Sequence, residues 1–229
     1  MNHISIALDG PSGAGKSTLA RLLAERLGFL YVDTGAIYRA VGLYTYQKGQ
    51  DPQDETAVAA LLPEIGLTLC HEDGIQRMFL GGEDVSKAIR MPEMSYYASR
   101  VSAHPAVRAF LLEMQKALAA KENVVMDGRD IGTVVLPDAS LKIYITATPE
   151  KRAERRYREL AEKGVGDSYE QVLEAIISRD TLDKNRAVSP LRPADDAVIL
   201  DTTDLDLSQS LEALVKLAQE RLGLGGNPV

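Results

Sequence analysis

The sequence has a single cysteine, Cys70, among its 229 residues. One thiol can form neither an intrachain disulfide nor a thiolate metal cluster, and it fits a reducing compartment. Long apolar runs are also missing, since none approaches the ~20 residues that span a bilayer. The N-terminus lacks the basic stretch of a signal peptide, and its short apolar run ends at Asp9. We therefore expect a soluble, cytoplasmic protein with no membrane partner.

An excess of basic residues is lacking as well. The chain has 26 Lys and Arg against 33 Asp and Glu, a formal charge of −7. A nucleic-acid polymer would be repelled at long range by this charge, so we expect no such partner. Hydrophobic residues make up 45% and charged residues 26%, which is ordinary globular composition. A chain of this size buries roughly 70–75% of its unfolded surface, so it folds without a metal or a disulfide.

Strand and helix patterns alternate along the chain. A buried-type strand over 4–8 enters a glycine-rich turn and a helix over about 16–27. This alternation predicts an α/β fold, in which a parallel sheet is covered by helices. Further strands are expected over 30–32, 124–126, 141–145 and 198–200. A second helix is expected to follow Gly35 and to reach about residue 48. Later helices are expected over 94–120, with a break at His104-Pro105, and over 149–163, 169–185 and 208–222.

The pattern changes between Pro63 and Pro92. Two short strands are expected over 67–70 and 77–80, on either side of an Asp73-Gly74 turn. This segment therefore reads as a small β-containing insertion.

A phosphate-binding motif follows the first strand. The residues Gly10-Pro11-Ser12-Gly13-Ala14-Gly15-Lys16-Ser17-Thr18 match G-x-x-x-x-G-K-[ST] in full. Glycines let backbone N–H groups converge on phosphate, and the helix N-terminus adds a positive dipole end. Lys16 supplies charge to the β- and γ-phosphates, and Ser17 offers a hydroxyl to Mg²⁺. The motif predicts a nucleoside triphosphate site, which kinases share with switch GTPases and motor ATPases.

Two further strand ends carry an aspartate followed by an arginine. Asp33 precedes Arg39 by six residues, and Asp127 is followed by Arg129 and Asp130. Either aspartate alone could be a helix cap or a turn residue. Because ligands of open α/β sheets bind at the carboxyl ends of strands, the two sets together favour a second ligand site, in which Asp33 could hold Mg²⁺ through water.

The late helices add two stripes of charge. Arg179, Asp183 and Arg186 are spaced i, i+4, i+7 and share a helical face. Arginine suits the planar recognition of a second phosphate and a ribose. Lys151, Arg155 and Arg158 form the other stripe, for which solvated surface pairs with nearby glutamates are an equal alternative. We expect the cations of both stripes, with Lys16, Arg39, Arg108 and Arg129, to converge on one cleft.

Four segments carry a resemblance: 9–18, 33–39, 127–135, and Arg179-Asp180 with 183–191. Through them the chain resembles the bacterial type 1 cytidylate kinases, a branch of the P-loop nucleoside monophosphate kinases, from about Ile4 to Leu222. The resemblance implies a five-stranded parallel sheet with helices on both faces. The kinase core would be 1–62 and 93–229, with a mobile lid at about 151–168, and the monophosphate-binding insertion would be 63–92.

The same resemblance implies transfer of the γ-phosphoryl group of Mg·ATP to CMP or dCMP, by a monomer. ATP would be bound by residues 10–18 and Arg155, and Mg²⁺ by Ser17 and Asp33; many relatives have Gly in place of Ser17, so its metal role rests on the P-loop motif. The catalytic cations would be Lys16, Arg129, Arg179 and Arg186. The CMP site would comprise Ser99, Arg108 and Asp130 at the base, Arg179 and Asp183 at the sugar, and Thr34, Tyr38, Arg39, Arg129 and Arg186 at the phosphate.

The base assignment has a physical basis. A carboxylate such as Asp130 can accept from the exocyclic amine of cytosine, whereas uracil has a carbonyl at that place. We therefore expect strong discrimination against UMP, because an unpaired buried polar group is costly. Two alternatives stay open: a monophosphate kinase with another base preference, such as UMP or AMP, and a P-loop regulatory module that senses nucleotide without transferring phosphate.

Overall fold

A parallel sheet forms the centre of the molecule. The computed structural model describes residues 3–162, 164 and 166–223. Its main sheet has five strands in the order β2-β6-β1-β7-β8, and all neighbouring pairs are parallel. The predicted α/β fold with a parallel sheet is therefore confirmed. The strands are β1 (Ser5–Asp9), β2 (Leu30–Asp33), β6 (Val124–Gly128), β7 (Leu141–Thr146) and β8 (Val198–Asp201).

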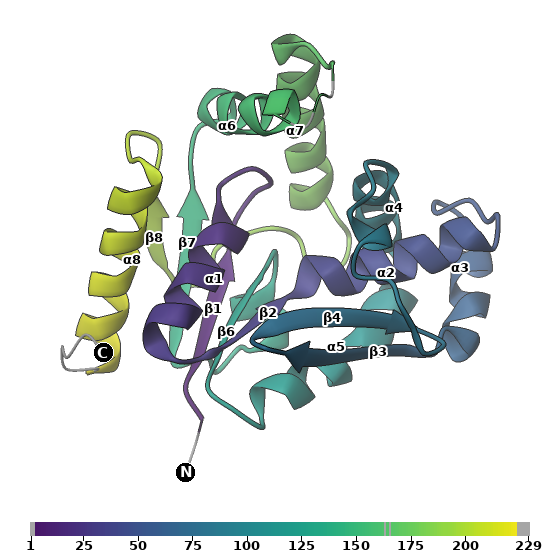
Figure 1. Cartoon of the computed structure of the whole chain (residues 1–229), viewed down its shortest axis with the longest axis horizontal. Helices are drawn as coiled ribbons and strands as arrows, with labels where there is room; N and C mark the ends of the chain where they lie inside the picture. Colours follow the sequence, from purple (N-terminus) through teal and green to yellow (C-terminus); the bar gives the residue numbers. More distant parts are fainter. Residues whose placement is uncertain (1–2, 163, 165, 224–229) are drawn as a thin grey trace.

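Helices cover both faces of this sheet (Figure 1). Successive side chains of a strand point to opposite faces. Ile6 and Leu8 of β1 accordingly pack in one cluster with α1 (Lys16–Leu27) and α8 (Leu207–Leu222). Ala7 belongs to the cluster on the other face, against α5 (Pro105–Ala119). Each central strand is thus buried on both sides, which explains its nearly continuous apolar sequence.

Local capping groups set the helix boundaries. Asp33 accepts a hydrogen bond from the backbone N–H of Ala36 and begins α2 (Thr34–Gln47). Ser168 with Gln171 and Asp206 with Gln209 form capping boxes at α7 (Tyr169–Lys184) and α8. The expected break at His104-Pro105 separates α4 (Glu93–Val101) from α5.

The insertion is a three-stranded antiparallel sheet that packs on α2. The expected hairpin is present as β3 (Leu67–Glu72) and β4 (Ile75–Leu80), and β5 (Glu83–Asp84) adds a short third strand. The structure also contains α3 (Glu55–Leu61), which the sequence reading did not anticipate. Met78 and Leu80 share one hydrophobic cluster with Ile37 and Val41 of α2. The segment therefore shares its core with α2.

Side chains of the hairpin also cover the free edge of the main sheet. Strand β2 is an edge strand, and edge strands leave backbone groups unpaired. The Gln76 amide accepts from the N–H of Asp33 at 2.8 Å and donates to its carbonyl at 3.1 Å. A ring nitrogen of His71 bonds to the Tyr31 carbonyl at 2.9 Å. These contacts fix the hairpin beside Asp33 at the carboxyl end of β2.

Helix α6 (Pro149–Glu162) and α7 form a separate layer above the strand ends (Figure 1). They pack on each other through a small cluster of Ala153, Val172 and Ile176. The expected lid, 151–168, corresponds to most of α6 and the connection to α7. Its residues 163 and 165 lie outside the described residues, as do the C-terminal residues 224–229 of the expected core. Within the described ranges, no helix is long and apolar enough to cross a membrane.

Gly42 lies where α2 packs tightly against α4. A Cβ atom at this position would lie 2.9 Å from the Tyr97 Cβ and 3.1 Å from the backbone nitrogen of Ala98. We expect Gly42→Val to lower the free energy of unfolding by about 2 kcal/mol, because the two helices must separate to admit the side chain. Urea denaturation followed by circular dichroism measures the change.

Gly166→Val is the matched control. A Cβ atom at Gly166 meets nothing within 4 Å. Its effect on unfolding should stay within about 0.5 kcal/mol. Equal losses in the two variants would show that the contact between α2 and α4 is not the cause.

Candidate active site

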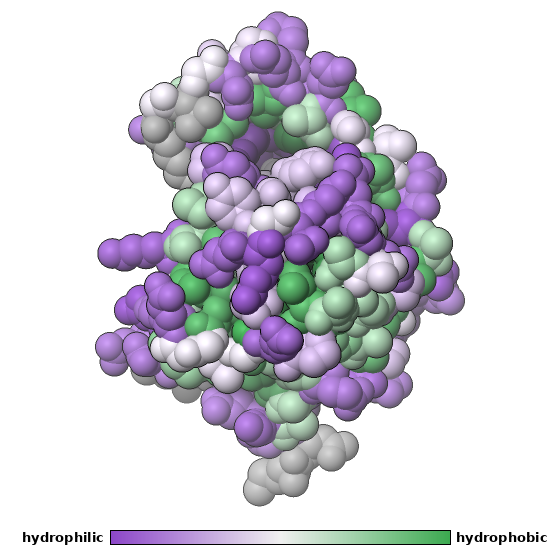
Figure 2. All heavy atoms as spheres, turned by 90° about the vertical axis from the view of Figure 1, so that its right-hand side faces the viewer, coloured by the Kyte–Doolittle hydropathy of each residue, from purple (hydrophilic) through white to green (hydrophobic). Residues whose placement is uncertain are grey.

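A large cleft lies at the carboxyl edge of the main sheet. It encloses about 1480 Å³, more than the roughly 300–1,000 Å³ of ordinary small-molecule pockets. The P-loop, the starts of α1 and α2, and the α6 and α7 layer border it. Figure 2 shows the surface hollowed beneath that upper layer, with hydrophilic side chains around the hollow. The volume suits two ligands bound side by side.

The register of the strands gathers their polar ends in this cleft. Asp33 pairs with Asp127 across β2 and β6, and Asp9 pairs with Gly128 across β1 and β6. Parallel strands end at the same edge, so the two sequence motifs after β2 and β6 meet beside the P-loop.

The P-loop passes close to β7 before it turns into α1. A Cβ atom at Gly10 would lie 2.0 Å from the carbonyl oxygen of Ile145, so only glycine fits there. Lys16 is 5% exposed, and its Nζ donates to the Pro11 carbonyl at 2.7 Å. Burial lowers the pKa of Lys16 below its ordinary value, and the nearby Arg129 and Arg179 lower it further. An anion bound between these cations would offset the repulsion between them.

Asp127 contacts Ser17, the residue of the phosphate-binding motif that is expected to hold Mg²⁺. The Ser17 hydroxyl donates to its Oδ2 at 2.7 Å, and the Tyr31 hydroxyl donates to its Oδ1 at 3.0 Å. Burial raises the pKa of Asp127, and the neighbouring Asp33 raises it further. A cation at this carboxylate would compensate for its burial.

Asp33 has other partners. Its Oδ1 caps α2 through Ala36, and its Oδ2 accepts from Arg39 at 2.7 Å. The alternative of a helix cap is therefore realised, and Asp33 also orients Arg39.

The sequence analysis named Asp127 at a strand end but did not pair it with Ser17. Ser17 lies at the start of α1, which follows β1, and β1 pairs with β6, the strand that carries Asp127. This strand pairing brings the two residues together, and neither motif reveals the contact alone.

A buried ion pair occupies the far side of the cleft. Arg108, 8% exposed, pairs with Asp130, 3% exposed. Arg108 also donates to the Ser102 carbonyl at 3.1 Å and lies over the Tyr38 ring, 5.5 Å from its centroid. A polar pair this deeply buried can recognise a flat polar ligand such as a base.

Between the two sides, three arginines surround Asp183. Arg129 Nε donates to Asp183 Oδ2 at 3.0 Å. Burial alone would raise the pKa of Asp183, but Arg129, Arg179 and Arg186 hold it below its ordinary value. Burial lowers the pKa of Arg179 to about 10, so it stays cationic at neutral pH. Among the described residues, none partners the buried Nε of Arg179 or Nη2 of Arg186.

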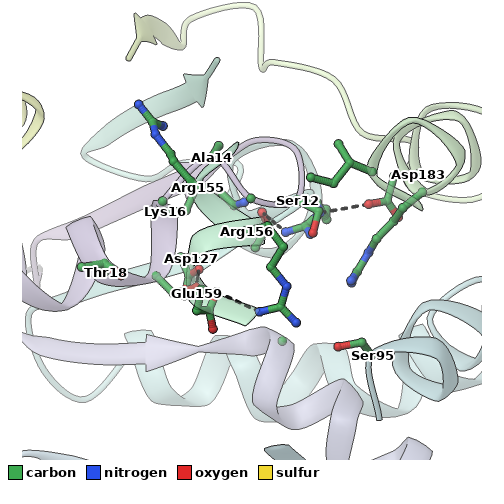
Figure 3. Close-up of a pocket in the computed structure, with 18 of the residues that line it drawn as sticks. Ser12, Ala14, Lys16, Thr18, Ser95, Asp127, Arg155, Arg156, Glu159 and Asp183 are labelled. Carbon is green, nitrogen blue, oxygen red and sulfur yellow. Dashed lines mark hydrogen bonds and ion pairs between the residues drawn. The ribbon is translucent and has the colours of Figure 1, made fainter. Parts of the chain in front are cut away.

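The structure brings nearly all the predicted residues together. The described residues that line the cleft include eleven Lys and Arg against eight Asp and Glu, although the whole chain has a charge of −7. The expected convergence of cations therefore occurs, and Figure 3 shows Lys16, Arg155, Arg156 and Asp183 around one space. The lining residues from the predicted set are Ser12, Gly13, Ala14, Gly15, Lys16, Ser17, Thr18, Asp33, Thr34, Tyr38, Arg39, Arg108, Arg129, Asp130, Arg155, Arg179, Asp183 and Arg186.

Three predicted residues are not in this lining. Gly10 and Pro11 are the first two residues of the loop. Gly10 lies against β7, and the Pro11 carbonyl accepts from Lys16. Ser99 lies on α4, and its carbonyl accepts from the Ser102 hydroxyl at 3.0 Å. Ser102 itself lines the cleft. The role of Ser99 at a base stays a prediction.

Asp9 supports this site from outside the cleft lining, and the sequence analysis did not select it. Its Oδ1 and Oδ2 accept from the N–H groups of Ile131 and Gly132, both at 2.7 Å. These residues begin the π-helical turn η3 (Ile131–Val135), directly after Asp130. Asp9 therefore fixes the segment that carries Arg129 and Asp130 to the strand that leads into the P-loop.

Comparison with known proteins gives one consistent family. A family model described as cytidylate kinase matches residues 6–220. The cytidylate kinase of Pelotomaculum thermopropionicum is 49% identical over 222 residues, which cover 96% of each chain. That of Caldicellulosiruptor bescii is 48% identical over 217 residues, 95% of this chain and 96% of the relative. A solved structure of an uncharacterized protein from Eubacterium ventriosum shares the fold at a TM-score of 0.51 and 14% identity, covering 95% of this chain and 99% of that one.

The titration of Asp9 gives a test of its burial. Burial raises the pKa of Asp9 to about 6 from 3.8, so the folded protein binds a proton at pH 4–6 that the unfolded chain does not. The contribution of Asp9 to stability therefore falls as the pH rises through this window, by about 3 kcal/mol. Relative to Asp9→Asn, which does not titrate, the wild type should lose stability from pH 4 to pH 6 in urea denaturation.

Asp138→Asn supplies the control, because it makes the same substitution at an exposed position. If the stability of Asp9→Asn changes with pH as that of the wild type does, burial does not raise the pKa of the Asp9 carboxyl.

Proposed function

The chain belongs to the cytidylate kinase family, and from that premise we propose that it transfers the γ-phosphoryl group of Mg·ATP to the 5′-phosphate of CMP or dCMP. The products are ADP and CDP or dCDP. One observation carries the proposal: a P-loop and a buried Arg108–Asp130 pair face the same cleft, with Arg129, Arg179 and Arg186 between them. A nucleotide-sensing module would not need this second set of groups.

The donor end of the cleft fits the triphosphate of ATP. The glycines of the P-loop and the start of α1 present N–H groups to phosphate, and Lys16 adds a buried positive charge. Lys16 is held at the Pro11 carbonyl in the structure. We propose that its Nζ transfers from this carbonyl to the β- and γ-phosphates when ATP binds. Arg155, at the edge of the cleft near Thr202 and Leu205, would contact the donor nucleotide.

The residues present fit a magnesium ion. Mg²⁺ usually takes one or two carboxylates together with substrate phosphates, so it needs no dedicated cluster of protein ligands. Across the described part of the chain there is no group of three His, Cys, Asp or Glu that could hold a metal. Ser17 and the buried Asp127 meet beside Lys16, and we propose that they hold the ion, with Asp33 next to Asp127 on the neighbouring strand. When bound, Mg²⁺ neutralises charge on the transferring group.

The acceptor end fits a nucleoside monophosphate. Arg39, Arg129 and Arg186 would bind its phosphate, together with Thr34 and Tyr38. The unpartnered donors of Arg179 and Arg186 support this, because buried N–H groups gain a hydrogen bond when an anion enters. Asp183 would accept from the sugar hydroxyls, since Arg129 orients its carboxylate.

Cytosine suits the buried pair at the end of the cleft. Asp130 would accept from the exocyclic amine, while Arg108 donates to the ring acceptors and Ser99 contributes a further contact. The pair is held by Ser102 and Tyr38 before a base arrives. Such preorganised polar groups reject a base that presents the wrong donor or acceptor.

No general base is required for the transfer. The acceptor phosphate is already an anion, so rate enhancement comes from bringing two polyanions into line and from neutralising the transferring group. Lys16, Arg129, Arg179 and Arg186 supply the charge. The α6 and α7 layer lies above the cleft, where its closure as a lid would exclude water and prevent ATP hydrolysis. Because one chain supplies both halves of the cleft, we propose that it acts as a monomer, in the cytoplasm.

A panel of acceptors tests the proposed activity. We expect acceptor-dependent ADP release with CMP and dCMP in a coupled assay, and at least about 100-fold lower kcat/KM with UMP, because uracil places a carbonyl against Asp130. AMP and GMP serve as further acceptors. Equal turnover of UMP and CMP would refute the base assignment, and no acceptor-dependent release with any of them would favour a sensor.

The same panel with Asp130→Asn tests the residue. The amide can donate to the uracil carbonyl, so the preference for CMP over UMP should fall by at least about tenfold. An unchanged preference would place base recognition elsewhere.

Lys16→Ala tests the P-loop. Removal of a cation aimed at the transferring phosphoryl group should lower kcat by at least about 100-fold. The circular dichroism spectrum should match the wild type, since Lys16 has its main bond within the loop. Loss of secondary structure in this variant would show that the lysine serves folding instead.

A further inference from the structure

Arg152 is a buried arginine that does not line the cleft. It lies in the first turn of α6 and is 2% exposed. Its Nε donates to the Ala147 carbonyl at 2.9 Å, and its Nη1 donates to the Ser12 carbonyl at 2.9 Å. Nη1 and Nη2 also bind the two carboxylate oxygens of Asp180, at 3.1 and 2.6 Å. One side chain thus joins the end of β7, the P-loop and α7.

The bond to Ser12 determines the orientation of a P-loop peptide. The Ser12–Gly13 peptide is trans, so its N–H points away from its carbonyl. Arg152 holds the carbonyl, which turns the Gly13 N–H to the opposite side, and Gly13 lines the cleft. Lys16 holds the preceding carbonyl, that of Pro11. Two consecutive carbonyls of the loop are therefore fixed by cations.

The bond to Asp180 joins the same arginine to the acceptor side. Asp180 is 7% exposed and follows Arg179 in α7, three residues before Asp183. A two-bond arginine–carboxylate fork fixes direction as well as distance. The position of Arg179 and Asp183 is thus tied to the Ser12–Gly13 peptide of the P-loop.

We propose that Arg152 is a positioning residue for phosphoryl transfer, which sets the Ser12–Gly13 peptide for the donor phosphate and holds α7 in register with it. The identity of the donor as ATP and the transfer reaction itself rest on the proposed function. A buried pair with a purely structural role would affect stability, and replacement of both partners by apolar groups would then be harmless to binding.

The double variant Arg152→Met/Asp180→Leu separates these roles. It removes both charges together, so no unpaired buried charge remains and the protein should fold. We expect its dissociation constant for Mg·ATP, measured by calorimetry without an acceptor, to rise at least tenfold, and its kcat to fall at least tenfold. Wild-type affinity and kcat in the folded double variant would overturn the proposal.

Asp180→Asn and Arg152→Lys complete the test. Asp180→Asn keeps Arg152 and its bond to Ser12, so its affinity for Mg·ATP should stay within threefold of the wild type. Arg152→Lys keeps the charge beside Asp180, which maintains folding if the double variant fails, but a lysine cannot reproduce the fork and the Ser12 bond together. Its affinity should fall at least tenfold. Wild-type affinity in Arg152→Lys, or an Asp180→Asn loss equal to that of the double variant, would overturn the proposal.

Arg77→Met is the matched control. Arg77 also pairs with carboxylates, those of Glu72 and Asp84 on the hairpin, and it lies outside the cleft. Its variant should bind Mg·ATP and turn over as the wild type does. Because ATP binding is measured without an acceptor, the result for Arg152 stands even if CMP proves not to be the acceptor.

Discussion

Like charges held close together are the constraint on which this structure depends. A cleft for two polyanions needs a surplus of cations, and cations in a poorly solvated site repel one another strongly. The fold meets this cost with fixed oxygen atoms between the cations. Arg39 has Asp33, Arg129 has Asp183, and Lys16 has the Pro11 carbonyl. The site is therefore formed before either nucleotide binds, and one buried donor each of Arg179 and Arg186 has no partner among the described residues.

The carboxylate of Asp33, like that of Asp127, comes from the end of a parallel strand, which explains why this part of the site could be predicted. Asp33 and Asp127 each follow an apolar run, and residues in that position of a parallel sheet meet at one edge. Helix starts such as Ser168 and Asp206 carry capping boxes, so their positions are local properties of the sequence. The P-loop is local as well. Predictions that depended on short-range patterns were accordingly close to the structure.

Features that depend on long-range contacts could not be predicted. Arg152 lies in a run of basic residues with Arg155, Arg156 and Arg158, and nothing in that run distinguishes the buried arginine from the half-buried and exposed ones. Its partner Asp180 is 28 residues away. The link between Gln76 and the backbone of Asp33 spans 43 residues, and it fixes the insertion beside the carboxyl end of β2. Such pairings follow from how the elements pack.

The anchoring of α6 limits how the layer above the cleft can close. Arg152 binds the P-loop and α7, and Arg155 donates to the carbonyls of Thr202 and Leu205, so the N-terminal half of the helix is fixed to the core. Arg156 and Arg158 pair only with glutamates of their own helix, Glu159 and Glu154, among the ion pairs that the described residues form. Those pairs can exchange for phosphate at little cost, because exposed pairs contribute roughly 0–1 kcal/mol. The closure proposed above would therefore pivot near Arg152, and it would move the outer arginines toward the cleft while the P-loop peptide stays in place.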